Sequence, residues 1–267
     1  MPSELNTWLE TATSAVLEAG GLVAEYYRAE SIVNTKGGDT RNLVTDADVA
    51  SEASITAALR AAFPGHAILG EETYRPGDLV DEQVPTWAID PIDGTSNFAH
   101  RLPLFVISVG LHHAGEGQVG VVHAPMLGWT FTAARGQGAF LNGEPIRVSE
   151  RAELSRALTG CDWPRDPELR ALALAAFSAF ATQGHTARSM GAAALGLAAV
   201  AAGWLDIYFN YHLAPWDTAA GVLLIQEAGG HVTAPDGSPW AINTEPILAT
   251  NGPLHPAAQA VLALYLP

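Results

Sequence analysis

Apolar residues recur at intervals of three and four along the first part of the chain, which is the spacing of one face of an α-helix. These positions are Leu5, Trp8, Leu9, Ala12, Val16, Ala19, Val23 and Tyr26. We predict one amphipathic helix here, capped by Ser3. A polar loop is predicted over 34–41, and a second helix from Thr45–Asp46 to the Phe63-Pro64-Gly65 stop.

Two short apolar runs then lead directly into acidic residues. Residues 67–69 precede Gly70-Glu71-Glu72, and residues 87–89 precede Asp90. Apolar runs of this length, bounded by turn-forming residues, are typical of buried strands. We therefore expect two strands that deliver carboxylates at their C-terminal ends.

The middle of the chain is rich in predicted strands joined by short turns. They cover 104–111, 119–124 and 129–133, and an Asn142-Gly143 pair predicts a hairpin within 140–146. Tight turns between consecutive strands indicate antiparallel pairing, so we expect a largely antiparallel sheet.

Strands and helices alternate in the last part of the chain. Strands are predicted over 157–160, 205–209, around Val232 and over 247–250, and helices over 167–181 and from Gly191, Asp217 and Pro253. The pattern changes near 145–155, from consecutive strands to alternating strands and helices. This change predicts two subdomains, 1–147 and 148–267, within a mixed α/β (α+β) fold.

Composition narrows the class of protein. The chain has 267 residues, of which 48% are hydrophobic, and 28 acidic residues against 13 basic ones give a formal net charge of −15. This much apolar material excludes a disordered chain. The acidic balance, without a basic cluster, argues against nucleic acid or an anionic membrane as partner. An anionic small molecule remains possible where bound cations invert the local field.

Targeting and redox features point to a cytoplasmic protein. Cys161 is the only cysteine, so there is no intrachain disulfide and no zinc site built from cysteines. The acidic N-terminal stretch does not resemble a secretory signal, and no apolar run has the length of a membrane span. The histidines lack metal-binding spacing, and we assign none of them to a metal.

The most informative chemistry lies in the string Asp90-Pro91-Ile92-Asp93-Gly94-Thr95. Pro91 forces a turn after the strand, and that turn can bring the Asp90 and Asp93 carboxylates and the Ile92 carbonyl to one point. Such an all-oxygen set suits Mg²⁺. The amides that open the turn at Thr95 could cradle a phosphate. Either Asp-Pro or Asp-Gly alone is equally typical of an ordinary turn, but the whole string favours a site.

Other acids stand at the starts of predicted helices or the ends of strands. Asp48 and Asp217 lie where helices begin, and an N-cap role would explain either of them alone. The Glu71-Glu72 pair follows a strand and taken alone could be a solvated surface pair.

Together these segments resemble the inositol monophosphatase family, within the Mg²⁺-dependent, lithium-sensitive phosphatase superfamily. The matching strings are Leu43 to Asp48, Gly70-Glu71-Glu72, Asp90 to Phe98, Trp216 to Gly221 and Glu227-Ala228-Gly229-Gly230, with lesser matches at Gly136–Gly143 and Arg188–Leu195. The resemblance implies a layered α-β-α-β-α sugar-phosphatase fold with a largely antiparallel N-terminal sheet and a smaller, mixed C-terminal sheet. It also implies a homodimer.

The resemblance further implies two to three Mg²⁺ ions. Glu71, Asp90 and the Ile92 carbonyl would hold one, Asp90, Asp93 and Asp217 a second, and Glu71 a weaker third. The N-terminal subdomain would thus carry most ligands, and the C-terminal one Asp217 and the substrate pocket.

Catalysis follows from the same resemblance. Glu71 and Thr95 would orient a metal-activated water that attacks phosphorus directly, with Asp48 bonded to the Thr95 hydroxyl. The Gly94 and Thr95 amides would bind the phosphoryl oxygens.

The substrate side departs from the family pattern. Gly191, Ala192 and Ala193 match a substrate-facing turn, but Asn210 stands where inositol-binding members usually have a glutamate. Asn210 can still bond a hydroxyl, although it carries no charge. The segment Gly160–Arg165 is either another substrate wall or a packed turn, and His212 is a candidate pocket residue.

We therefore predict a phosphomonoesterase that acts on a small phosphorylated polyol or sugar, similar to inositol 1-phosphate. The alternatives within the superfamily are a histidinol-phosphatase, a fructose-1,6-bisphosphatase and a 3′(2′),5′-bisphosphate nucleotidase. The alternative from another class is a non-catalytic dimeric protein that binds a partner.

Overall fold

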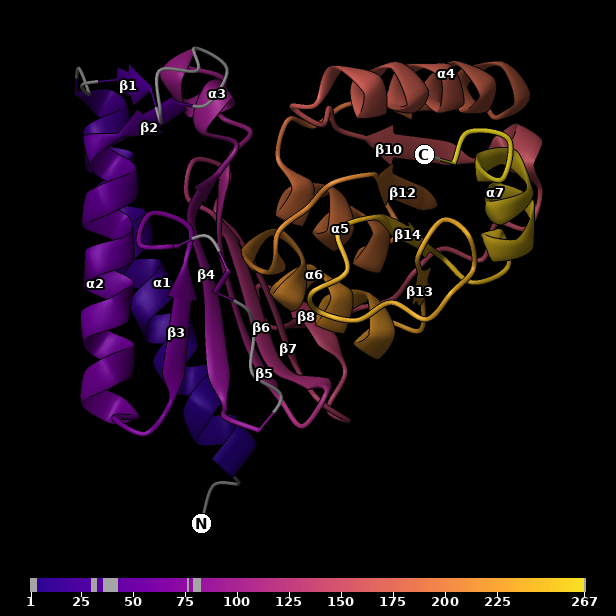
Figure 1. The fold of residues 1–267 in the computed structure, drawn as a ribbon. Coiled ribbons are helices and arrows are strands. Elements are labelled where there is room, and N and C mark those ends of the chain that lie inside the picture. Colours follow the sequence, from indigo (N-terminus) through magenta and orange to yellow (C-terminus); the bar gives the residue numbers. More distant parts are fainter. Residues whose placement is uncertain (1–3, 30–32, 36–42, 76, 79–82, 267) are drawn as a thin grey trace.

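The computed structural model describes residues 4–29, 33–35, 43–75, 77–78 and 83–266. Helices and sheets alternate in layers, as Figure 1 shows. Helices α1 and α2 cover one face of a seven-stranded sheet, α5 and α6 lie between this sheet and a five-stranded one, and α4 and α7 lie on the far side. This is the layered α-β-α-β-α arrangement that the sequence predicts.

The first helical layer buries the apolar face that the sequence pattern indicates. Helix α1 (Glu4–Arg28) and helix α2 (Asp46–Ala62) pack on the sheet through residues such as Val16 and Ile55, which are fully buried. The predicted Ser3 cap lies outside the described residues. The predicted loop over 34–41 is wrong at its start, because residues 34 and 35 belong to strand β1 (Val33–Thr35). This strand pairs with β2 (Leu43–Thr45). The rest of the predicted loop, 36–41, lies outside the described residues.

The seven strands of the large sheet follow one another in space in chain order. They are β3 (Ala67–Gly70), β4 (Thr86–Asp93), β5 (Val106–His113), β6 (Glu116–Ala124), β7 (Trp129–Ala134), β8 (Ala139–Leu141) and β9 (Glu144–Ile146). Strands β3 and β4 are parallel, and every later pair is antiparallel. The predicted hairpin turn is confirmed, with Asn142 and Gly143 both at positive φ.

Strand β4 runs further than predicted. It continues past Asp90 to Asp93, and its pairing with β5 shifts register between these two residues. Pro91 cannot donate to the ladder, and the amide of Ile92 donates instead to Asp90 Oδ1 at 3.0 Å. The irregularity therefore acts as a bulge inside the strand and re-aims the acidic side chains without ending it. The short helix α3 (Thr95–Ala99) follows.

The central helices approach the large sheet closely. At Gly110 of β5 an added Cβ would lie 2.6 Å from Ala219 Cβ of α6, and at Gly120 of β6 it would lie 2.9 Å from Ala220 Cα. Helix α6 (Pro215–Glu227) begins two residues before the predicted Asp217, because Pro215 presets a helical φ and Asp217 bonds the amide of Ala214.

Helix α5 (Ala193–Ala201) starts later than predicted, since Gly191 has φ +73° and so lies outside the helix. None of the described helices combines the length and the apolar character that a membrane crossing requires.

The smaller sheet is mixed, as predicted. Its order is β11 (Thr186–Arg188), β10 (Leu158–Cys161), β12 (Ile207–Asn210), β14 (Ile247–Thr250) and β13 (His231–Thr233), with the first three parallel and the last two antiparallel to their neighbours. A 3₁₀ turn (Leu154–Arg156) precedes it, and α4 (Pro167–Gln183) and α7 (His255–Leu262) cover its outer face. Strand β11, three residues with a polar sequence, was not predicted.

Candidate active site

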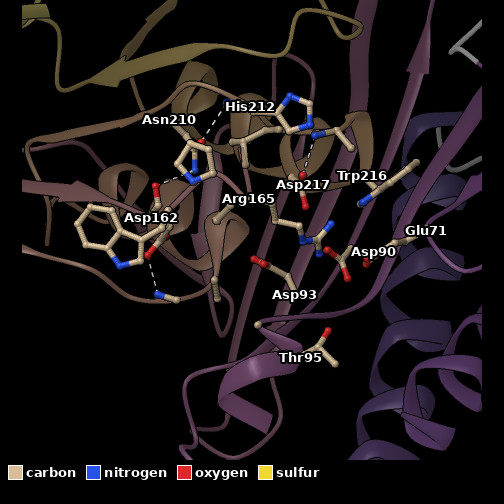
Figure 2. A pocket seen from close by; sticks show the side chains of 18 of the residues that line it. Glu71, Asp90, Asp93, Thr95, Asp162, Arg165, Asn210, His212, Trp216 and Asp217 are labelled. Carbon is tan, nitrogen blue, oxygen red and sulfur yellow. Dashed lines mark hydrogen bonds between the residues drawn. The ribbon is translucent and has the colours of Figure 1, made fainter. Parts of the chain in front are cut away.

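A cavity of about 770 Å³ opens where the C-terminal ends of β3 and β4 meet the first turns of α3, α5 and α6. All but one of the predicted site residues line it: Glu71, Asp90, Ile92, Asp93, Gly94, Thr95, Gly191, Ala192, Ala193, Asn210 and Asp217. The exception is Asp48, which is fully buried behind Thr95. Residues that lie far apart in the sequence thus form the wall of one cavity (Figure 2).

Three carboxylates form the centre of this cavity. Asp90 and Asp93 come from the irregular end of β4, and Asp217 comes from the first turn of α6. Each can present a carboxylate oxygen such that the oxygens all lie within 4.8 Å of one another. Oxygen ligands at this spacing suit a hard divalent cation.

The electrostatics of the cluster also fit a cation. Burial raises the pKa of Asp90 well above its usual range, and the charges of Glu71 and Asp93 raise it further. Burial and the charge of Asp217 likewise raise the pKa of Asp93. Burial and Glu71 raise the pKa of Asp217 to about 6. Carboxylates held this close repel one another unless positive charge lies among them, so the donor set fits a divalent metal.

Backbone amides fix the orientation of the three aspartates. Asp93 Oδ2 accepts from the amide of Ala194 at 2.6 Å, where α5 begins. Asp217 Oδ2 accepts from the amide of Ala214 at 2.7 Å. The amide of Ile92 donates to Asp90 Oδ1 in the same way. Because a backbone amide holds one oxygen of each carboxylate, the cluster is preorganised before any ligand binds.

Thr95 stands beside the cluster at the start of α3. Its hydroxyl lies 3.3 Å from Asp48 Oδ1 and 3.1 Å from the carbonyl oxygen of Ile92. Asp48 is itself held by Thr45, whose amide and hydroxyl donate to Oδ2 at 2.8 and 2.5 Å. Since the Thr95 proton has acceptors on the protein side, the lone pairs of its oxygen can accept a hydrogen bond from a ligand or a water.

Glu71 follows β3 in a turn supported by a residue that the sequence analysis did not single out. The buried carboxylate of Glu52, on α2, accepts from the amide of Glu72 at 2.7 Å. Gly70 makes room for it, because a Cβ there would overlap the Glu52 carboxylate. Glu52 lies one helical turn after Asp48, so both project from the same face of α2. That spacing is the signal that could have identified it.

Comparison with known proteins agrees with this geometry. The profile of the inositol monophosphatase family matches residues 4–265. An inositol-1-monophosphatase from Synechocystis is 43% identical, over 98% of this chain and 91% of its own length. The Nus factor SuhB of Pseudomonas aeruginosa is 39% identical, over 97% of each chain. The solved structure of an Anabaena inositol monophosphatase superposes with a TM-score of 0.87 at 40% identity, covering 99% of this chain and 98% of that one.

The chain belongs to the inositol monophosphatase family. It is therefore a phosphatase, of a family that uses divalent metal and acts on phosphorylated substrates. The resemblance predicted from the sequence strings is confirmed over nearly the whole chain.

On the substrate side of the cavity, the structure shows the burial and the hydrogen-bond partners of Asn210. Its side chain is only 3% exposed. Its Nδ2 donates to the carbonyl oxygen of Asp162 at 3.3 Å, and its Oδ1 accepts from the amide of His212 at 3.1 Å. Asn210 borders the cavity, but both ends of its amide already have partners within the protein.

The neighbouring wall contains polar residues that the sequence analysis did not assign. The buried Asp162 accepts from the amide of Gly191 at 2.6 Å and from the hydroxyls of Ser189 and Tyr208 at 2.8 and 3.0 Å. Burial raises its pKa. Asp162 thus ties its segment to the Gly191 turn, and residues 162–166 form part of the cavity wall.

The outer wall holds a hydrogen bond between a histidine and a glutamate, and two arginines. His212, predicted as a pocket residue, lines the cavity, and its Nδ1 lies 3.0 Å from Glu245 Oε2. Arg165 and Arg170 line the same side. In the sequence, Arg165 is indicated only by its place in the string Asp162–Arg165, between a predicted strand and a predicted helix.

Proposed function

We propose that the chain is a Mg²⁺-dependent phosphomonoesterase that hydrolyses a small phosphorylated polyol or sugar, similar to inositol 1-phosphate. The observation that carries this proposal is the cluster of three carboxylates within 4.8 Å of one another at the centre of the cavity. The name of the Synechocystis relative, an inositol-1-monophosphatase, favours the same substrate class.

The residues divide into those that hold metal and those that hold substrate. Glu71, Asp90 and the Ile92 carbonyl would hold one Mg²⁺, Asp90, Asp93 and Asp217 a second, and Glu71 a weaker third. Bound Mg²⁺ supplies Lewis-acid stabilisation of phosphoryl oxygens and lowers the pKa of a water. The crowded carboxylates of this chain provide the negative charge that such binding needs.

Proton handling belongs to Glu71 and Thr95. The Thr95 hydroxyl donates to Asp48 or to the Ile92 carbonyl, so its oxygen can accept a hydrogen bond from the attacking water. The Glu71 carboxylate would orient the same water towards phosphorus and take the one proton that it loses. The amides of Gly94 and Thr95 face the phosphoryl oxygens, and Gly191, Ala192, Ala193 and Asn210 face the leaving alcohol.

A panel of phosphomonoesters tests the proposal. We expect Mg²⁺-dependent release of phosphate from inositol or sugar phosphates, abolished by EDTA and restored by added Mg²⁺. The same panel includes histidinol phosphate, fructose 1,6-bisphosphate and a 3′(2′),5′-bisphosphate nucleotide, and a higher kcat/KM for one of these would identify that alternative. If purified protein releases no phosphate from any member, the proposed function is wrong and a partner-binding role is favoured.

Metal binding should stabilise the fold in a pH-dependent way. The pKa of Asp217 is raised to about 6 in the folded chain, so its protonated form stabilises the metal-free fold at low pH, and this contribution is lost as the pH rises through about 6. Mg²⁺ removes this penalty and competes with protons for the same oxygens. At about a hundred times its Kd it adds about 2.7 kcal/mol, or about 5–10 °C in Tm for a chain of this size.

Thermal unfolding with and without Mg²⁺, at about pH 8 and about pH 5, measures this effect. The increase in Tm should be large at the higher pH and small at the lower one. An equal increase at both would contradict the assignment of the buried carboxylates as ligands.

Four further properties belong to the same proposal: a homodimer, a cytoplasmic location, inhibition by lithium, and a subdomain boundary between residues 147 and 148. Light scattering of the purified chain tests the first, and a lithium titration in the phosphatase assay tests the third.

A further inference from the structure

Arg165 lies in a short segment whose backbone is held at both ends. Asp162, at one end, is tied to Ser189, Gly191 and Tyr208. Asp166, at the other end, caps α4 by accepting from the amides of Glu168 and Leu169 at 2.9 Å. Arg165 therefore projects from a fixed position on the cavity wall.

The side chain of Arg165 points towards the acidic centre. In Figure 2 its guanidinium lies between the labelled carboxylates of Asp217, Asp93 and Asp90. Arg165 also lines the same cavity as these three aspartates. The position and direction of its side chain therefore place its positive charge beside the acidic centre.

The other described basic side chains on the cavity wall have hydrogen-bond partners elsewhere. Arg170 donates its Nε to the carbonyl oxygen of Pro164 at 2.8 Å, and His212 pairs with Glu245. Arg165 is therefore the described cation whose charge is directed at the place where chemistry would occur.

The balance of charge suggests what Arg165 binds. Glu71, Asp90, Asp93 and Asp217 carry four negative charges when ionised, which the two more tightly held divalent cations balance. While the weaker third site is empty, a phosphate monoester dianion brings negative charge that these groups leave unbalanced. A guanidinium presents a planar set of N–H donors that matches the oxygens of a phosphate.

We propose that Arg165 binds the phosphate oxygens of the substrate and of the released phosphate, on the side of the site that faces the leaving group. This inference rests on the proposed phosphatase function and adds to it a cationic residue from outside the acidic strings. When divalent cations occupy the carboxylates, the attraction of Arg165 to them weakens, and its side chain is available to the incoming dianion.

The test compares Arg165→Gln and Arg165→Lys with the wild type. Arg60→Gln, on the exposed end of α2, is a control that removes one positive charge far from the cavity. Loss of charge-assisted hydrogen bonds should raise KM, and the inhibition constant of inorganic phosphate, about 10- to 100-fold in Arg165→Gln. Arg165→Lys should fall between this variant and the wild type, because it keeps the charge but loses the paired donors. Arg60→Gln should match the wild type.

A binding measurement separates phosphate recognition from metal binding. We expect inorganic phosphate to raise the Tm of the Mg²⁺-loaded wild type and to lose this effect in Arg165→Gln, while Mg²⁺ alone stabilises the variant at least as well as the wild type. If KM, phosphate inhibition and the phosphate-induced Tm shift all match the wild type, Arg165 is only a counter-ion of the carboxylates and the inference is wrong. If the Gln variant does not fold, the Lys variant decides by the same criteria. Failure of the proposed function would appear differently, as a wild type without phosphatase activity.

Discussion

Replacing Asp93 by Asn should abolish turnover while leaving the fold intact. Asp93 provides one of the three clustered carboxylates, and its Oδ2 also accepts from the amide of Ala194 at 2.6 Å. An Asn oxygen can keep that hydrogen bond but has no charge to hold Mg²⁺. Loss of several kcal/mol of metal-derived transition-state stabilisation corresponds to a fall in kcat on the order of 10³-fold or more.

Stability should change in the opposite direction. Burial and the charge of Asp217 raise the pKa of Asp93 well above its usual value, so ionised Asp93 destabilises the metal-free fold at neutral pH. Asp93→Asn removes that penalty, and its metal-free Tm should equal or exceed that of the wild type. The increase in Tm on adding Mg²⁺ should be largely lost.

The matched control is Asp46→Asn, an exposed aspartate in the first turn of α2. It should keep wild-type kcat and the wild-type response to Mg²⁺. Full activity in Asp93→Asn would reject the two-metal assignment. A loss of activity accompanied by a much lower metal-free Tm would mean that Asp93 is structural.

Replacing Glu71 by Gln should lower kcat about 10²- to 10⁴-fold, which is the usual range for a residue that accepts a proton in the reaction. Glu71 lines the cavity and acts electrostatically on Asp90 and Asp217. Gln has nearly the same size but cannot accept the proton of the attacking water. Its neutral oxygen also weakens the metal site, so the Mg²⁺ concentration at half-maximal activity should rise.

Glu72→Gln provides the matched control, since Glu72 neighbours Glu71 but is not among the residues lining the cavity. Rates measured at saturating Mg²⁺ separate the two effects. If saturating Mg²⁺ restores wild-type kcat in Glu71→Gln, the residue serves only to bind metal and its role towards water is wrong.

Local sequence signals predicted most of the fold, because they depend on neighbouring residues. The periodic apolar face of α1 and the Asn142-Gly143 turn are of this kind, and both are confirmed. The errors arose where distant partners decide. Strands β1 and β11 have three residues each and exist only through their pairing with β2 and β10. Strand β4 was predicted to end at Asp90, but its pairing with β5 continues to Asp93 across the bulge at Pro91.

The candidate site divides in a similar way. The acids around Asp90 and Asp217 could be selected from their strings, and the structure brings them to one cavity, while their individual roles remain proposals. Asp162, Arg165 and Glu52 were not assigned individually, since each matters through a partner far along the chain. Asp162 bonds Gly191, Arg165 faces Asp217, and Glu52 supports the turn after β3. Asn210 was selected from its place in the sequence and lines the cavity, but its hydrogen bonds to Asp162 and His212 could not be read from the sequence.

The close packing of α6 on Gly110 and Gly120 limits which parts of the cavity can change during evolution. Any side chain at either position would push α6 away from the sheet and move Asp217 relative to Asp90 and Asp93. Selection should therefore remove mutations at Gly110 and Gly120, because they would disturb the three clustered aspartates. Trp163, Pro164 and Glu245 line the same cavity but belong to no strand of either sheet. New leaving-group preferences can accumulate there one substitution at a time, while the hydrolytic centre is inherited unchanged.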